Sequence, residues 1–233
     1  MKKLPSLSIV FPAFNDEHTI APLVKDANRL ALPLADVHEI IVVNDASEDN
    51  TVTLLKALQK EIGVLRVVTH KNNRGYGGAL ISGFNKAKHA FIFYTDSDGQ
   101  YDVGELPKLI AAMDDATDMV TGFKIARADP WYRKIMGNTY NYCMKKLLRL
   151  RVRDIDCDFR LFRKSILDNL ILIVESSIFD AQFLKEIEVR GARIKEVPIH
   201  HYPRRFGHSQ VLRFSHMVKS LSDLGKIVFR RYI

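Results

Sequence analysis

The chain has 233 residues, 47% hydrophobic and 27% charged, which fits one large globular domain and excludes a disordered protein. Two cysteines are too few for a disulfide framework, so we expect a reduced compartment, and no apolar stretch approaches the ~20 residues of a transmembrane helix. The net charge is +8, and residues 201–233 hold seven basic residues against one acid. This basic tail predicts an anionic partner.

Strands and helices alternate through the first half of the chain. Continuous apolar runs predict buried strands, and apolar residues at helical spacing predict amphipathic helices. The expected strands are residues 7–11, 39–44, 64–70, 90–95 and 118–122, and the expected helices are residues 17–30, 51–63, 79–89 and 105–113. This order predicts an α/β fold with a mostly parallel central sheet and helices on both faces.

The second half of the chain is less regular. The pattern predicts a loop that leads into a helix, then a short strand, two helices, a strand and a final helix. In chain order these elements are residues 123–135, 132–150, 156–163, 164–172, 179–190, 193–199 and 211–229. The last helix places apolar residues on one face and most basic residues outside it, which predicts a C-terminal basic amphipathic helix. We divide the chain into a main domain, 1–200, and a basic segment, 201–233.

Polar residues follow the first, second and fourth strands directly, and ligands bind at the carboxyl ends of parallel strands. After the fourth strand, Asp96, Asp98 and Gln100 alternate, so in an extended segment they can face the same way. Two carboxylates and a carboxamide oxygen suit Mg²⁺ or Mn²⁺. The alternative interpretation is a polar turn with an acidic helix start.

Three further features have two interpretations each. Asp45, at the end of the second strand, can bind a ribose or base, or belong to a helix-capping cluster. Asn15 and Glu17 can face a nucleotide or cap a helix. The turn Gly75–Gly78 lacks the third glycine of a dinucleotide fingerprint, because that position falls on Leu80. We therefore expect a tight turn, and one interpretation is that a ligand's backbone or sugar packs against it.

Arginines in the irregular half suit phosphate, because a guanidinium group forms paired hydrogen bonds, although loop arginines are more often simply solvated. Three acids, Asp154, Asp156 and Asp158, alternate ahead of Arg160. They form either an acidic edge of the active cleft or an exposed polar strand.

Four segments in this order resemble family 2 glycosyltransferases of the GT-A fold: FPAFNDE, VVNDASEDNT, NRGYGGAL and YTDSDGQYD. The later DCDFRLFRK and EVPIHHYPRRFGHS and the basic tail resemble the dolichyl-phosphate mannose synthase branch, which makes polyprenyl-phosphate sugars. The resemblance implies a Rossmann-like GT-A sheet. It also implies inverting transfer of a hexose from a nucleotide-diphosphate sugar, of the GDP-mannose or UDP-glucose class, to a polyprenyl phosphate.

The resemblance also implies roles for individual residues. Mg²⁺ or Mn²⁺ would be held by Asp96, Asp98 and Gln100. The donor would be bound by Pro12, Ala13, Asn15, Glu17, Asp45, Asp96, Ser97 and Arg204. The acceptor would be bound by Lys124, Arg127, Arg133, Arg160 and Ser209, and catalysis would rest on Asp98, Arg133 and Arg204. The chain departs from the family at Lys124, where arginine is common, and at Gln210, where lysine is common.

This chemistry needs no strong general base, because a phosphate oxyanion is already a nucleophile near neutral pH. Positioning and electrostatic stabilisation of the leaving diphosphate can carry catalysis. The basic tail would either lie on anionic lipid or pack on the domain. We therefore expect a peripheral enzyme at the cytoplasmic face of a membrane. Its partner would be a membrane subunit or a second copy of the chain.

Three alternatives remain open from the sequence. The first is a family 2 transferase that acts on a polysaccharide or cell-envelope glycan. The second is a nucleic-acid-binding module that uses the basic tail, although the nearly neutral main domain argues against a nucleic-acid partner. The third is a nucleotide-sugar-binding protein without turnover.

Overall fold

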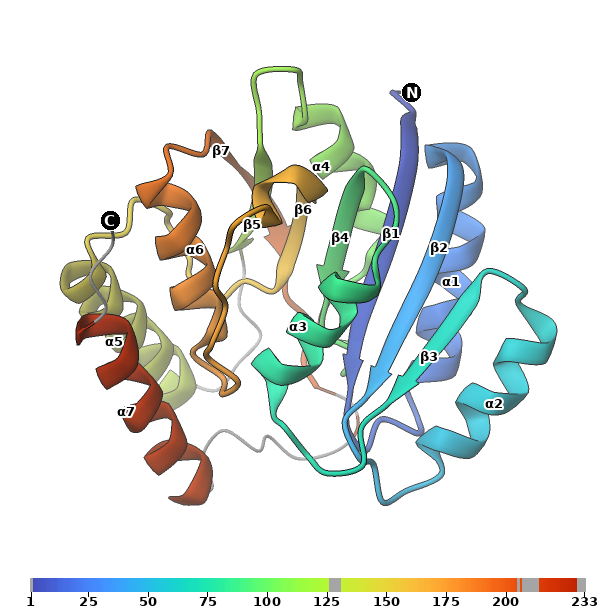
Figure 1. Ribbon diagram of the computed structural model, residues 1–233, viewed down its shortest axis with the longest axis horizontal. Coiled ribbons are helices and arrows are strands. Elements are labelled where there is room, and N and C mark those ends of the chain that lie inside the picture. Colours follow the sequence, from blue (N-terminus) through green and yellow to red (C-terminus); the bar gives the residue numbers. More distant parts are fainter. Residues whose placement is uncertain (1, 126–130, 205, 207–213, 230–233) are drawn as a thin grey trace.

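The computed structural model describes residues 2–125, 131–204, 206 and 214–229, without the side chains of residues 132, 133 and 214–217. Its seven strands form one sheet in the order β3-β2-β1-β4-β6-β5-β7 (Figure 1). The strands are β1 (Leu4–Ala13), β2 (Ala35–Asn44), β3 (Leu65–Thr69), β4 (Phe91–Thr95), β5 (Met119–Ile125), β6 (Phe159–Arg163) and β7 (Ile194–His200). The helices are α1 (Ile20–Leu34), α2 (Thr51–Glu61), α3 (Tyr76–Lys86), α4 (Leu106–Ala112), α5 (Trp131–Leu148), α6 (Phe179–Val189) and α7 (Phe214–Phe229). Two 3₁₀ turns, η1 (Val103–Glu105) and η2 (Lys164–Leu167), complete the described elements.

The sheet is mostly parallel, as the sequence predicts. Strand β6 lies antiparallel between β4 and β5, and the other described pairs are parallel. The parallel strands β1, β2, β3 and β4 therefore end at the same edge of the sheet, which is the lower edge in Figure 1. The loops that leave this edge carry most of the polar clusters singled out in the sequence.

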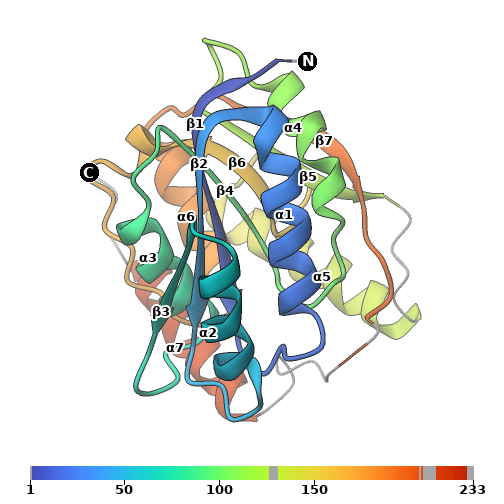
Figure 2. The same ribbon diagram turned by 90° about the vertical axis from the view of Figure 1, so that its right-hand side faces the viewer.

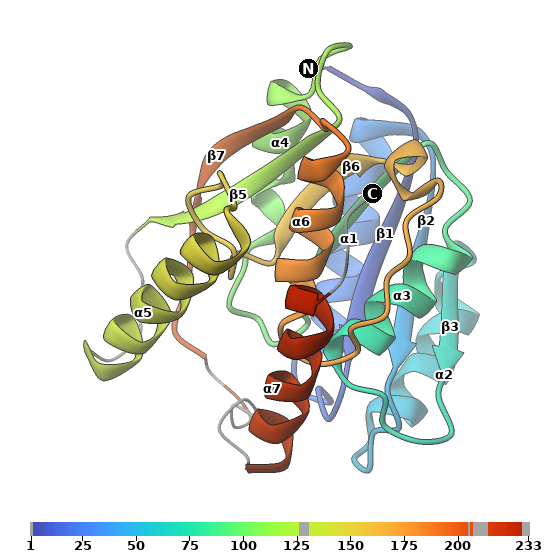
Figure 3. The same cartoon turned by 60° about the vertical axis from the view of Figure 1, so that its left-hand side comes forward.

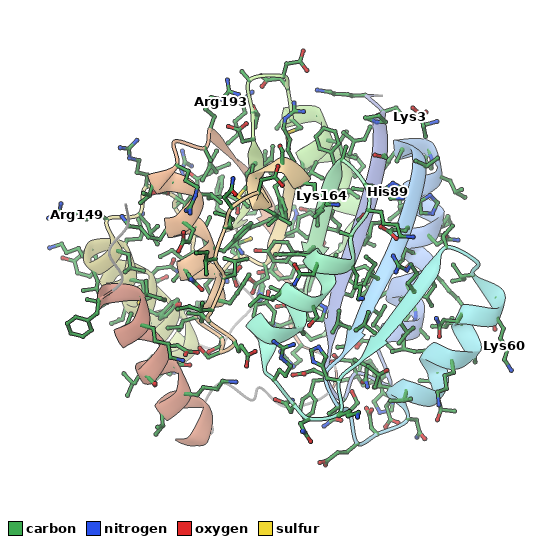
Figure 4. All side chains as sticks on the ribbon, viewed as in Figure 1. Lys3, Lys60, His89, Arg149, Lys164 and Arg193 are labelled. Carbon is green, nitrogen blue, oxygen red and sulfur yellow. The ribbon has the colours of Figure 1, made fainter. Side chains whose placement is uncertain are left out.

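Helices cover both faces of the sheet, which confirms the predicted α/β architecture (Figure 2). One buried cluster joins α1, α2 and α4 to the sheet, and a second joins α3, α5, α6 and α7 to its other face. Charged residues at the periphery, such as Lys3, Lys60, Arg149 and Arg193, project outward (Figure 4).

One strand boundary and one helix differ from the sequence prediction. Strand β1 continues through Pro12 to Ala13, because its pairing with β4 ends at Val10 and the missing N–H of proline is then not needed on that side. The helix expected at 164–172 is wrong: only the 3₁₀ turn η2 forms, and Asn169 adopts a left-handed φ of 64°.

Helices α5 and α7 lie at the end of the molecule away from α1 and α2 (Figures 1 and 3). Within the described part of the chain, no helix combines the length and apolar character needed to cross a membrane. Helix α7 is attached to the domain through Ile227 and Asp223, which are both 1% exposed.

Candidate active site

The loop after β1 is joined to the loop after β2 by side chains expected to bind the donor. Asn15 Oδ1 accepts a hydrogen bond from the N–H of Glu48 at 2.8 Å, and the N–H of Asn15 donates to the Ser47 hydroxyl at 2.9 Å. Glu17 Oε2 accepts from the backbone and side-chain nitrogens of Asn50 at 3.0 and 2.8 Å, directly before α2. Asn15 and Glu17 therefore tie the two loops together at the sheet edge.

Asp45 anchors the turn that follows β3. Its carboxylate accepts hydrogen bonds from the backbone N–H groups of Arg74 at 2.9 Å and Gly75 at 2.7 Å. Its Oδ1 also lies 2.6 Å from His70 Nδ1, and His70 Nε2 lies 2.8 Å from the Ser82 hydroxyl of α3. The side chain of Asp45 is 4% exposed, so this acid holds the 70–75 turn in place at the edge of the sheet.

Ser97 connects the loop after β4 to the loop after β1. Its hydroxyl lies 2.6 Å from both the carbonyl oxygen of Pro12 and Oδ2 of Asp16. Burial raises the pKa of Asp16 above its ordinary value, against the lowering effect of the Ser97 hydrogen bond. The carbonyl of Ala13 accepts from the N–H of Asp45 at 2.8 Å. Backbone and hydroxyl contacts of Pro12, Ala13 and Ser97 thus join the loops after β1, β2 and β4 at this edge of the sheet.

Asp98, Gln100 and Arg204 form one cluster. The Arg204 guanidinium donates to Asp98 Oδ2 and, from Nε, to Gln100 Oε1 at 3.3 Å. The N–H of Gln100 donates to Asp98 Oδ1 at 2.9 Å. The Asp98 carboxylate and the Gln100 carboxamide oxygen therefore face one cationic group. They meet through a turn at Gly99, whose φ is 76°, and not through the extended segment that the sequence prediction assumed.

Asp96 is the member of the set to which no described residue donates a hydrogen bond. Its side chain is half-buried and stays partly exposed. Burial, together with the negative charges of Asp158 and Asp98, raises the pKa of Asp96 well above its ordinary 3.8. A half-buried carboxylate among other carboxylates favours a cation beside it.

This donor set fits a hard divalent ion. No group of three His, Cys, Asp or Glu side chains within the described ranges could hold a metal by itself. Mg²⁺ is typically bound through one or two carboxylates and completed by substrate phosphates and water, so Asp96 and Asp98 with Gln100 meet that requirement.

The segment after β7 lies over this cluster. The N–H of Tyr202 donates to the Gln100 carbonyl at 2.9 Å, and Gln100 Nε2 donates to the Tyr202 carbonyl at 3.2 Å. Phe206 lies with its ring 5.1 Å from the His18 ring of the loop after β1. These contacts bring Arg204 to the sheet edge from more than a hundred residues away in the chain.

Arg160 does not face an acceptor, contrary to the role that the resemblance implies. It is fully buried in β6, where its guanidinium pairs with Asp180 of α6 and lies 3.4 Å from Asp158. It also donates to the Thr121 hydroxyl at 3.1 Å and to the Tyr94 hydroxyl. With its donors used inside the protein, Arg160 acts on the site only by holding these groups in position.

Asp158 and Asp180 share the single guanidinium of Arg160, which the two interpretations of the 154–158 acids did not include. Burial and the negative charge of Asp180 raise the pKa of Asp158 to about 8, although Arg160 opposes this shift. Asp158 also contributes most, after burial, to the raised pKa of Asp96. The sequence signal was the alternation of three acids ahead of Arg160, which did not reveal which acid turns inward.

Lys124 is also committed to protein contacts. Its ammonium group lies 2.8 Å from Asp156 Oδ2, and its side chain is 2% exposed. Lys124 borders a pocket of about 660 Å³ between α5 and the end of β5. The other lining residues are Phe123, Asn138, Asn141, Tyr142, Lys145, Lys146, Leu150, Arg153 and Asp154.

Three expected site residues fall wholly or partly outside the described residues. Arg127 and Ser209 belong to ranges that the structure does not describe. Arg133 lies in the first turn of α5, and its side chain is among those not described. The predicted acceptor contacts of these three residues stay predictions.

The comparison with known families identifies the chain. The family model described as glycosyl transferase family 2 matches residues 8–171, which includes the loops after β1, β2, β3 and β4. The chain belongs to glycosyl transferase family 2. This confirms the family that the sequence motifs predict, and with it glycosyltransferase activity in general terms.

Solved structures share this fold. The chain is similar to glucosyl-3-phosphoglycerate synthase from Mycobacterium tuberculosis, solved with uridine-diphosphate, with a TM-score of 0.74, 18% identity, and coverage of 97% of this chain and 82% of that one. It is also similar to a mannosyltransferase from Pyrobaculum calidifontis, solved with GDP-Man and Mn²⁺, with a TM-score of 0.67, 16% identity, and coverage of 96% and 65%. Other structures of the synthase contain Mn²⁺ or Mg²⁺ with uridine-diphosphate.

Proposed function

We propose that this family 2 glycosyltransferase transfers a hexose from a nucleotide-diphosphate sugar to a polyprenyl phosphate, as the dolichyl-phosphate mannose synthase branch does. The observation that carries the proposal is the meeting of Asp96, Asp98, Gln100 and Arg204 at the carboxyl edge of the sheet. Carboxylates beside a guanidinium suit a donor that carries a diphosphate and a divalent ion.

Asp96, Asp98 and Gln100 are the residues that would hold Mg²⁺ or Mn²⁺. The ion, when bound, supplies positive charge that stabilises the leaving nucleoside diphosphate. Arg204 brings a second positive charge to the same place, because it already contacts Asp98 and Gln100. The structures that share this fold and contain uridine-diphosphate or GDP-Man with Mn²⁺ support this assignment.

The reaction needs positioning more than proton transfer. A phosphate oxygen of the acceptor forms a bond to the anomeric carbon of the hexose, while the bond from that carbon to the diphosphate oxygen breaks and its electron pair leaves with the diphosphate. The configuration at the anomeric carbon inverts. Arg204 orients the leaving group, and the buried Arg160 holds Asp158 and Asp180 behind Asp96.

Helix α5 supports a lipid acceptor. It exposes Trp131, Ile135 and Tyr142 by 74%, 57% and 60% of their surfaces. The pocket beneath α5 adds Lys145 and Lys146 to this apolar face. An apolar surface next to lysines fits the interface of an anionic membrane, where the phosphate head of a polyprenyl chain lies.

Helix α7 supplies a second apolar surface at the same end of the molecule (Figure 3). Leu221 and Phe229 are 68% and 88% exposed, whereas Ile227 faces the domain. We infer a peripheral enzyme on the cytoplasmic face of a membrane, which contacts lipid through α5 and α7. A membrane partner subunit or a second copy of the chain would add to this contact.

The test is transfer of a labelled hexose to a short polyprenyl phosphate in the presence of Mn²⁺. GDP-mannose, UDP-glucose and UDP-GlcNAc are offered in parallel, and the label is measured in the organic phase. We expect one donor to label the lipid, and we expect Asp98→Asn to lower this transfer by about 10²-fold or more, because it removes a charge at the diphosphate.

Phosphoglyceric acid is the control acceptor, since the similar synthase has been solved with it. The open pocket lined by Lys145, Lys146 and Arg153 makes a small phosphorylated acid the second candidate acceptor. Label that appears only in the water-soluble product would replace the lipid acceptor with this second candidate. Label in neither product, with any donor, would contradict the proposed function.

A further inference from the structure

The glycine turn after β3 receives a segment of the protein itself. A Cβ atom added at Gly75 would lie 2.6 Å from the carbonyl oxygen of Glu175, and one at Gly77 would lie 2.4 Å from the carbonyl oxygen of Val174. The N–H of Gly78 donates to the Glu175 carbonyl at 3.3 Å. The glycines are therefore needed where the 174–175 segment packs on the turn, which corrects the expectation that they face a ligand.

Helix α7 reaches the same turn through one lysine. Lys219 Nζ donates to the carbonyl oxygen of Arg74 at 2.6 Å and lies 3.9 Å from Glu175 Oε2. The Arg74 guanidinium donates to Glu175 Oε1 at 3.0 Å from Nε and at 2.5 Å from Nη2. Lys219, Arg74 and Glu175 thus form a junction of two cations and one carboxylate over the turn.

Other contacts hold α7 on the domain without Lys219. Asp223 Oδ2 accepts from the N–H of Ser176 at 3.3 Å, whereas Asp223 Oδ1 pairs within α7, 2.6 Å from Lys226 Nζ. Ile227 is buried against the core. Removal of the Lys219 ammonium group should therefore release the turn while the helix stays attached.

The turn in question is the one that Asp45 anchors at the nucleoside side of the edge. The backbone N–H groups of Arg74 and Gly75 donate to Asp45, and the Arg74 carbonyl accepts from Lys219. One peptide segment is thus held from the sheet on one side and from α7 on the other. A change at either end alters the wall against which a nucleotide would pack.

We propose that Lys219 is a positioning residue that holds the 70–78 turn in its nucleotide-binding shape, so that α7 sets the affinity for the donor. The proposal rests on the proposed function, because it assumes that a nucleoside diphosphate binds at this edge. It adds that α7, which we place at the membrane, also supports the donor site through its contact with the 70–78 turn.

Three variants of the full-length chain test the junction. Lys219→Met removes the charge, and Lys219→Arg keeps it. Lys226→Met removes an equal charge from the same helix, at a position whose hydrogen bond among the described residues is to Asp223. Hydrogen exchange of the peptide that covers residues 70–80 measures the turn directly, with no ligand present. We expect faster exchange in Lys219→Met alone, by about 3- to 10-fold, as local opening becomes easier.

Titration of the same proteins with UDP and GDP in Mn²⁺ measures the consequence for the donor. We expect the nucleotide Kd to weaken by about 3- to 10-fold in Lys219→Met, as a partly exposed charged contact allows, and to stay near wild type in Lys219→Arg and Lys226→Met. In turnover assays of Lys219→Met, the donor KM should rise by a larger factor than kcat falls. The melting temperature of Lys219→Met should match that of Lys226→Met.

Unchanged exchange in the Lys219→Met turn overturns the proposal, and so does an equal loss of nucleotide affinity in Lys219→Met and Lys226→Met. If the wild-type protein binds neither UDP nor GDP, the proposed function fails and the link from Lys219 to donor affinity fails with it. The exchange result then still decides whether α7 holds the turn, so the two failures are distinguishable.

Discussion

Replacement of Asp158 by asparagine should make the protein more stable at pH 8, although it removes a partner of a buried arginine. Two buried carboxylates, Asp158 and Asp180, share the single guanidinium of Arg160, and Asp180 is the closer of the two. The Asp158 carboxyl has a pKa of about 8 in the folded chain, against an ordinary 3.8. Asparagine keeps the shape and an accepting oxygen and removes the surplus charge.

The sign of the pH dependence follows from the raised pKa. The folded state holds a proton on Asp158 that the unfolded state has already lost, so wild-type stability falls as the pH rises from about 4 towards 8. One proton corresponds to ~1.4 kcal/mol per pH unit, or ~4 kcal/mol between pH 5 and pH 8. Because the Asp158 side chain keeps 14% of its exposure, we expect Asp158→Asn to recover ~2–4 kcal/mol at pH 8.

Urea unfolding at pH 5 and pH 8 in the presence of EDTA measures this difference. Asp156→Asn is the matched control, because Asp156 is 43% exposed and lies on the same segment, although its partner Lys124 is 2% exposed. The pH dependence of the control should match that of the wild type within ~1 kcal/mol. A wild-type protein equally stable at both pH values, or an Asp158→Asn variant that is less stable at pH 8, would contradict the prediction.

Three other predictions concern the site and its supports. Gly77→Ala should destabilise the fold by ~1–3 kcal/mol in urea unfolding, since the new Cβ would meet the Val174 carbonyl, whereas Gly63→Ala, with nothing within 4 Å, should be neutral. Arg204→Gln should increase the affinity for Mn²⁺ in the absence of nucleotide by about 3- to 10-fold, because the substitution removes a cation that competes for Asp98. An electron paramagnetic resonance titration measures this affinity, and an unchanged value would show that Arg204 does not compete. Leu221→Ser combined with Phe229→Ser should reduce sedimentation with anionic vesicles and leave the melting temperature unchanged, and equal sedimentation would remove α7 from the membrane contact.

The first half of the fold could be predicted because local signals and tertiary structure agree there. Strands such as β2 and β4 are buried on both faces and form continuous apolar runs, and the intervening helices have regular apolar spacing. The antiparallel place of β6 between β4 and β5 could not be predicted, because it depends on pairing between segments about seventy residues apart in the chain.

The error at residues 164–172 has a tertiary cause. The segment has apolar residues at helical spacing, but after η2 the chain must reach the glycine turn with Val174 and Glu175. Gln182 of α6 fixes the 173–174 segment by accepting hydrogen bonds from the N–H groups of Ile173 and Val174 at 3.0 and 2.9 Å. Nothing in residues 164–172 themselves indicates this docking.

At the candidate site, the sequence predicted which loops meet but not where each side chain points. Asp98 and Gln100 do meet, but through a turn with Gly99 at a φ of 76°, which the predicted extended segment did not include. The contacts of Asp45 depend on the 70–75 turn, and the burial of Arg160 depends on Asp180 from a distant helix. A charged residue in a motif is satisfied either by a ligand or by the fold, and only the three-dimensional contacts distinguish these cases.

We propose that Asp96 and Asp98 hold a divalent ion at the donor's diphosphate. Binding of GDP and UDP to the wild-type protein and to Asp96→Asn, measured by calorimetry with Mn²⁺ and with EDTA, tests this directly. We expect Mn²⁺ to strengthen wild-type binding of one nucleotide by about 10-fold or more, and Asp96→Asn to lose this gain. Nucleotide binding that is equally strong in EDTA, or a full Mn²⁺ effect in Asp96→Asn, would contradict it.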